Sequence, residues 1–325
     1  MTLTVAEING YTTTMDVLFV VNIIIELYLL FNIVFNSDSL SKAFTRNLLF
    51  TLFSLFSLNI LFFILKPFVI FPAGILVSGG FLKISVLTSQ IIMIFLVVFF
   101  CFLVDTLIII TWERYFSLLA IEKHSKLLQY RIVVYSITFI VDTVSNIGYV
   151  FTTFGLTEDA MAVDELHITF RQEMNDYLKL RQSNIVAFKT ASTAVYIDVV
   201  ANGILAFFGR AISTYCAIYL LKKYVQGKTL SNFTTNKLKV MSLVALSQAV
   251  VILLVGIVPC YGMIITVYLF STYKYVEEMF LVCSVVVMQM PLAIACITIY
   301  TVKPYQNTIR KVLRMIYSKI FKKSV

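Results

Sequence analysis

Residues 84–115 read ISVLTSQIIMIFLVVFFCFLVDTLIIITWERY, and this stretch decides the fold. Before Thr111 it carries a single charge, Asp105, and a helix needs roughly 20 apolar residues to cross a bilayer. The stretch is therefore long enough to be a membrane-spanning helix. The triplet Glu113-Arg114-Tyr115 stands where this helix is expected to meet water.

The composition of the whole chain agrees with a membrane protein. Hydrophobic residues make up 60% of the 325 residues, charged residues 13%, and the mean hydropathy is +0.92. A soluble domain of this composition would expose large apolar patches. Backbone groups must be paired in lipid, and the apolar runs are longer than the alternating strands of a membrane barrel. We therefore predict an all-α membrane protein.

Seven apolar segments have the length of membrane-spanning helices. Their predicted bounds are about 15–35, 48–71, 84–111, 132–151, 194–221, 240–270 and 279–302. Pro67 and Pro72 are expected to break the end of the second span, and Gly74, Gly79 and Gly80 to form a flexible turn before the third. No span resembles another closely enough to suggest the inverted repeat of a transporter. The prediction is a seven-helix bundle over residues 1–302 and a tail over residues 303–325.

The basic residues predict the orientation of this bundle. With the amino terminus outside, the inner segments hold 18 of the 26 lysines and arginines, the outer segments hold seven, and Arg210 lies within a span. Because basic loops are retained in the cytoplasm, we predict that the amino terminus is outside. The net charge of +9 is then a signal of topology and not of a nucleic-acid partner. The sequon Asn232-Phe233-Thr234 would lie inside, out of reach of glycosylation.

The tail after residue 302 has a helical pattern of its own. Apolar side chains recur at steps of three and four residues, with basic side chains between them: Ile309, Val312, Leu313, Ile316, Ile320 and Phe321 against Arg310, Lys311, Arg314, Lys319, Lys322 and Lys323. We predict an amphipathic helix in the interface, held by apolar burial and by attraction to anionic lipid of the inner leaflet. The alternative is a basic tail that stays in solvent.

The sequence offers little to enzymology. It has no glycine loop for a phosphate and no nucleophile elbow, and its two histidines, His124 and His167, stand on different loops without metal-ligand spacing. We predict no enzyme activity, no cofactor and no metal site.

Glu113, Arg114 and Tyr115 form the sharpest candidate site. A guanidinium at the inner end of a central helix can pair with Glu113, or with an acid on another helix, and release that partner when the bundle opens. Alternatively, Arg114 only reaches toward the lipid headgroups. Pro259 and Pro291 interrupt spans six and seven, and we expect a kink at each of them.

Further candidates lie within the predicted spans. Asp105 and Arg210 occupy the inward halves of spans three and five, so they could form a buried pair, or each could face a hydrated cavity alone. A pocket for a small molecule is predicted at the outer ends of the spans. The residues proposed to line it are Ser85, Thr88, Ser89, Tyr196, Asp198 and Tyr261.

Two short motifs indicate a family. Residues 113–116 read Glu-Arg-Tyr-Phe, residues 303–305 read Lys-Pro-Tyr, and spans six and seven each hold a proline. With seven spans and an outer amino terminus, the chain resembles the G-protein-coupled receptors, and in particular the serpentine chemoreceptors of nematodes. It departs from the rhodopsin-like pattern at Asn59, near the expected position of an aspartate. The resemblance implies a chemosensory receptor of the plasma membrane, and of the sensory cilium, that binds a small molecule and activates a heterotrimeric G protein.

Two other functions compete with a receptor. A seven-helix ligand-gated ion channel would have the opposite topology, which the distribution of basic residues disfavours. A transporter of small solutes is suggested by five charges within the spans: Glu26, Asp105, Asp142, Asp198 and Arg210. It is disfavoured because the spans show no internal repeat.

Overall fold

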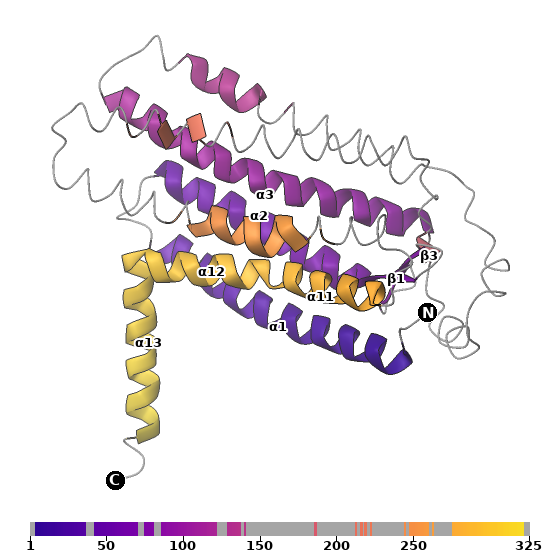
Figure 1. Cartoon of the computed structure of the whole chain (residues 1–325). Coiled ribbons are helices and arrows are strands. Elements are labelled where there is room, and N and C mark those ends of the chain that lie inside the picture. The colour runs from indigo at the N-terminus through magenta and orange to yellow at the C-terminus, as the bar shows by residue number, and fades with distance from the viewer. Residues whose placement is uncertain are drawn as a thin grey trace.

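The computed structural model describes a bundle of long helices with a small sheet at one end (Figure 1). The residues described are 4–36, 42–70, 75–80, 86–121, 129–137, 140, 185–186, 212, 215–216, 218–219, 222, 244, 247–259, 262 and 275–321. The elements are α1 (Val5–Phe35), α2 (Lys42–Leu65), β1 (Pro67–Ile70), β2 (Ile75–Ser78), α3 (Val86–Ile121), β3 (Ile185–Val186), the π-helical η1 (Ile252–Ile257), α11 (Val276–Met288), α12 (Met290–Thr301) and α13 (Lys303–Phe321).

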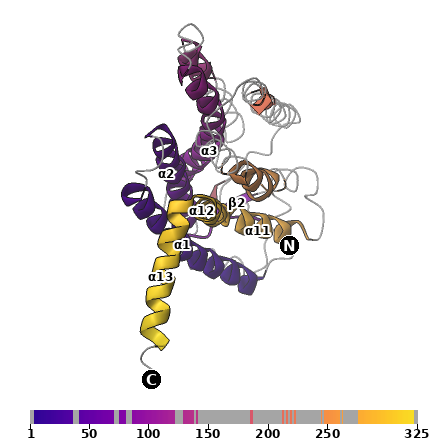
Figure 2. The ribbon, with the colours of Figure 1, turned by 90° about the vertical axis from the view of Figure 1, so that its left-hand side faces the viewer.

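The long helices pack side by side. Helix α2 packs against α1 and α3, and α1 also packs against α11 and α12. The amino terminus, the sheet and the start of α11 lie at one end of the bundle, and α13 leaves from the other end, turned away from α12 (Figures 1 and 2). The segment of span four that is described, residues 130–137, is helical.

Helix α1 begins ten residues before the predicted start at Met15. Thr4 caps it, because its side chain accepts a hydrogen bond from the Glu7 backbone while the Glu7 carboxyl accepts one from the Thr4 backbone. This capping box satisfies amide groups that have no partner within the helix. In the threonine-rich stretch 12–14, which is helical, each hydroxyl donates to a backbone carbonyl three or four residues earlier.

The predicted second span extends to about residue 71, beyond the end of helix α2. Helix α2 ends at Leu65, because Lys66 has a φ of 40°, in the left-handed region, and Pro67 follows it. Strands β1 and β2 pair as an antiparallel hairpin in which Pro67 pairs with Ser78 and Ile70 with Ile75, and β3 adds a third strand beside β2. Gly79 closes the hairpin by donating to the Lys66 carbonyl at 3.1 Å. The prediction of a helical protein is confirmed, but these strands were not expected.

The other boundaries differ in ways that bear on the site. Helix α3 continues to Ile121, so Glu113-Arg114-Tyr115 lies inside a helix and not at its end. Span seven is divided at Gln289 into α11 and α12. Among the described residues, three helical stretches are long and apolar enough to cross a membrane: Val5–Phe35, Phe44–Leu65 and Val276–Thr301. The remaining parts of spans four, five and six lie outside the described residues, and the count of seven spans stays a prediction.

The core consists of two apolar clusters along the bundle axis. One gathers around Ile8, Tyr11 and Met15 near the sheet, and the other around Leu29, Ile33 and Tyr305 near the start of α13. On α1, the core residues before Asn22 belong to the first cluster and the core residues after it to the second. Polar side chains therefore occupy the core between two apolar layers.

Candidate functional site

Glu113 is the best-defined residue of the predicted switch. Its side chain is only 9% exposed, and it forms an ion pair with Arg131 and accepts a hydrogen bond from the hydroxyl of Tyr135. Both partners belong to the next helical segment that the structure describes, residues 130–137. The contact therefore joins α3 to the next helix, and we call these three residues the Glu113 clasp.

Aromatic rings surround the Glu113 clasp. The ring of Phe116 meets that of Tyr135 edge to face, with centroids 6.0 Å apart, and the Arg131 guanidinium lies 5.7 Å from the Tyr135 centroid. Trp112 contacts both Tyr115 and Phe116, with centroids 6.3 and 5.9 Å apart. Trp112, Tyr115 and Phe116 share one face of α3, because positions three and four apart on a helix are neighbours.

The charge of Arg131 is secured by its surroundings. Partial burial lowers the pKa of Arg131, but the hydrogen bond with Tyr135 and the charge of Glu113 raise it, and the net change is upward. The guanidinium therefore stays protonated, and the Glu113 clasp is not opened by loss of the arginine's proton. Arg114 lies in α3, but its side chain is outside the described residues.

The two predicted kinks occupy different settings. Pro259 is buried two residues after the end of η1, whereas Pro291 is in the first turn of α12, after the break at Gln289. A proline is tolerated in a first turn because its missing amide proton would have no partner within the helix. Within η1, a Cβ added to Gly256 would come 2.8 Å from the Met290 sulfur and 3.1 Å from the Phe100 ring. Three helices therefore meet closely at Gly256.

Polar side chains join the helices in the core, and apart from Asn59 the sequence did not single them out. The Asn22 amide nitrogen donates to the Met288 carbonyl at 2.9 Å and to the Asn59 side-chain oxygen at 3.3 Å. Gln248 donates to the Thr298 hydroxyl at 2.7 Å. These contacts could have been expected from the sequence, because single Asn and Gln residues stand within apolar runs and a buried polar group needs a partner.

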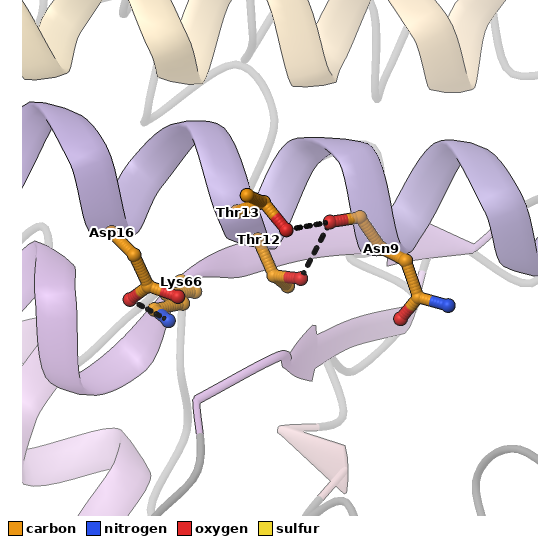
Figure 3. Close-up of polar contacts among 5 residues, drawn as sticks. All are labelled: Asn9, Thr12, Thr13, Asp16 and Lys66. Carbon is orange, nitrogen blue, oxygen red and sulfur yellow. Dashed lines mark hydrogen bonds and ion pairs between the residues drawn. The ribbon is translucent and has the colours of Figure 1, made fainter.

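The end of the bundle near the sheet has its own polar contacts. The Tyr11 hydroxyl donates to the Pro67 carbonyl at 2.8 Å. Asp16 forms an ion pair with Lys66, whose side chain is only 4% exposed (Figure 3). On the same helix, Thr12 and Thr13 both donate to the Asn9 carbonyl. The contacts of Tyr11 and Asp16 fasten α1 to the end of α2 and to the hairpin.

The remaining predicted residues are not brought together by the described part of the structure. Asp105 is buried on α3, but Arg210 lies outside the described residues, so their pairing stays a prediction. Thr88 is exposed near the start of α3. The other predicted pocket residues, Ser85, Tyr196, Asp198 and Tyr261, are outside the described residues, as is the side chain of Ser89.

The described residues also carry no metal-binding group. No cluster of three or more His, Cys, Asp or Glu side chains is found among them.

Residues 6–315 match the family model described as "Serpentine type 7TM GPCR chemoreceptor Srh". The chain belongs to this family. The match runs from the first turn of α1 into α13, so it includes the clasp, both prolines and the hairpin. A comparison of the receptor with curated proteins finds no match. The serpentine chemoreceptor family expected from the two short motifs is thereby confirmed, and with it a protein of the membrane.

Proposed function

We propose that this receptor binds a small molecule from outside the cell and activates a heterotrimeric G protein inside it. Its family is one of chemoreceptors of the G-protein-coupled class. The observation that carries the proposal is the Glu113 clasp, which joins α3 to the following helix right beside Arg114. A contact between two helices at this position can hold one arrangement of the bundle and be lost in another.

The clasp also bears on how Arg114 would act. Because Arg131 and Tyr135 engage the Glu113 carboxyl, we expect Arg114 to pair with an acid on another helix in the resting arrangement. Bound ligand would favour a second arrangement in which span six swings near Pro259 and Arg114 leaves this acid. The opened crevice, lined by Lys222, Lys223, Lys237 and Lys239, would then receive the G-protein α subunit. The ligand's preference for one arrangement supplies the energy, typically about 1 to 3 kcal/mol of coupling.

The tail would hold the receptor's inner side against the membrane. Helix α13 exposes Arg310, Lys311 and Arg314, and its first turn is fixed to the bundle because Tyr305 is fully buried. Basic side chains on a helix anchored in this way suit an anionic inner leaflet. We propose the plasma membrane as the location, with the sensory cilium as the specific site.

The test replaces Arg114 in the full-length receptor. GDP–GTP exchange on a co-expressed G-protein α subunit is measured without ligand and with a panel of volatile and lipid-like molecules. We expect Arg114→Ala to reduce exchange about tenfold, within the range of typical allosteric coupling, while the amount at the cell surface is unchanged. Arg46→Ala, an exposed arginine near the start of α2, is the matched control. Unchanged exchange in Arg114→Ala would rule out the proposed switch.

A further inference from the structure

The core of the bundle contains an incompletely satisfied polar layer, made of Asn22 and Glu26 on α1, Asn59 on α2 and the Met288 carbonyl on α11. The three side chains are at most 2% exposed. The Asn22 amide nitrogen donates to the Met288 carbonyl and to the Asn59 side-chain oxygen. These hydrogen bonds determine the orientation of both side-chain amides. The Asn22 oxygen and the Asn59 nitrogen are then left to face other groups.

Four buried atoms in this layer have no hydrogen-bond partner in the described structure. They are the Asn22 side-chain oxygen, both carboxyl oxygens of Glu26 and the Asn59 side-chain nitrogen. Glu26 follows Asn22 by one helical turn, so the two share a face of α1, and the bond from Asn22 to Asn59 shows that this face packs against α2. Buried polar atoms are costly when unpaired, and an unpaired carboxylate is the most costly of them. The layer therefore calls for a ligand that satisfies all four atoms.

No charged group in the described part of these helices is placed to neutralise Glu26. On α1, Asp16 is about 15 Å away along the helix and is paired with Lys66. On α2, Lys42 and Arg46 precede Asn59 by about 20 Å or more. On α11, Glu277 and Glu278 precede Met288 by about 15 Å, and α12 carries no charge.

We propose that this layer is a buried proton-binding site and that Glu26 carries the proton in the arrangement described. A proton on one carboxyl oxygen lets that oxygen donate to the Asn22 oxygen. The other carboxyl oxygen then accepts from the Asn59 nitrogen. One added hydrogen therefore gives all four atoms a partner. A metal cation would satisfy the three oxygens but would face the amide hydrogens of Asn59, which repel it.

The proton-binding site lies next to the break that divides span seven into α11 and α12. Asn22 joins the site to the Met288 carbonyl, and Met288 is the last residue of α11 before the break at Gln289. Loss of the proton would place a negative charge beside this break. The proton-binding site goes beyond the proposed signalling function, and spectroscopic and thermal measurements test it without a G protein.

Infrared spectroscopy of the full-length receptor in lipid nanodiscs tests the site directly. We expect a carbonyl stretch of a neutral carboxylic acid in the wild type, shifted in heavy water and lost in Glu26→Gln. Glu7→Gln removes an exposed acid of the same helix and should keep the band. Asn59→Ala should keep the band at a shifted frequency, because one hydrogen bond to the carbonyl is lost. A band that persists in Glu26→Gln, or that is absent from the wild type, would overturn the proposal.

A second measurement uses the wild-type receptor and does not depend on whether a variant folds. Its thermal denaturation is followed in sodium chloride and in an equal concentration of an organic-cation chloride. We expect the same midpoint in both, because a proton and not a metal occupies the layer. A midpoint raised specifically by sodium would assign the site to a metal cation and show the proton proposal to be wrong.

Discussion

Glu113 shows how a single buried acid can join two helices. Its carboxyl group is nearly inaccessible to water and is held by a cation and a hydroxyl from the neighbouring helix. A buried charge deprived of its partner is costly, whereas an exposed ion pair contributes little. The stability of this junction should therefore depend on each partner of Glu113.

Removing either partner of Glu113 should destabilise the receptor. We expect Arg131→Gln to lower the free energy of unfolding by about 1 to 2 kcal/mol, since water still reaches the arginine, and Tyr135→Phe to lower it by about 1 kcal/mol. Denaturation of the purified receptor in detergent measures both. When either variant is combined with Glu113→Gln in a double-mutant cycle, the two losses of stability should not add, because both substitutions break the same contact of the Glu113 carboxyl group. Additive losses would contradict the clasp.

At the scale of elements, the bundle departs from regular helix geometry in two neighbouring places. Span six contains the π-helical η1 before Pro259, and span seven is interrupted at Gln289 before Pro291. The two irregularities meet where Gly256 approaches Met290. π-helical turns are frequent at functional sites because the wider turn shifts the side chains that follow.

Two glycine variants test this close approach. Gly256→Ala should lower the free energy of unfolding by about 1 to 3 kcal/mol, because the added methyl group meets Met290 and Phe100. Gly10→Ala is the control, since a Cβ at this position of α1 has no heavy atom within 4 Å. It should be neutral or stabilising by about 0.5 to 1 kcal/mol, because alanine favours the helix. Equal effects of the two variants in the same denaturation assay would show that η1 tolerates a side chain at Gly256.

At the scale of the whole molecule, the outer surface of the bundle suits lipid. Large apolar side chains are exposed on α1 in steps of three and four residues: Val17, Val20, Ile24, Leu27, Phe31 and Val34. Such a stripe on a helix that also has a buried face is expected of a helix between a protein core and a bilayer. The direction in which the bundle crosses the membrane is predicted by the basic residues.

Tags at the two ends of the chain test that direction in intact cells. An impermeant antibody should reach a tag at the amino terminus, and should reach a tag after α13 only when the cells are permeabilised, because the inner segments are the basic ones. Asn232 should remain unglycosylated, which the mobility of the protein after glycosidase treatment checks. The reverse result would put Arg114 outside the cell, end the G-protein proposal and favour a ligand-gated channel.

The sequence by itself determined the class of protein and its family. Hydropathy is a local property, so the apolar runs were enough to predict the helices α1, α2 and α3, and residues 113–116 and 303–305 were enough to recognise a serpentine chemoreceptor. The ends of helices were harder to predict. The left-handed backbone of Lys66 and the hairpin that follows depend on strand pairing, which apolar character does not encode.

Only the tertiary structure decided which polar groups meet. Glu113 was a candidate from its position, but its pairing with Arg131 and Tyr135 depends on how two helices are rotated toward one another. Asn22 and the Met288 carbonyl are distant in sequence and meet because α1 packs against α11. In a core built mostly of interchangeable apolar side chains, the rare polar groups must find partners, and packing alone determines which partners they find.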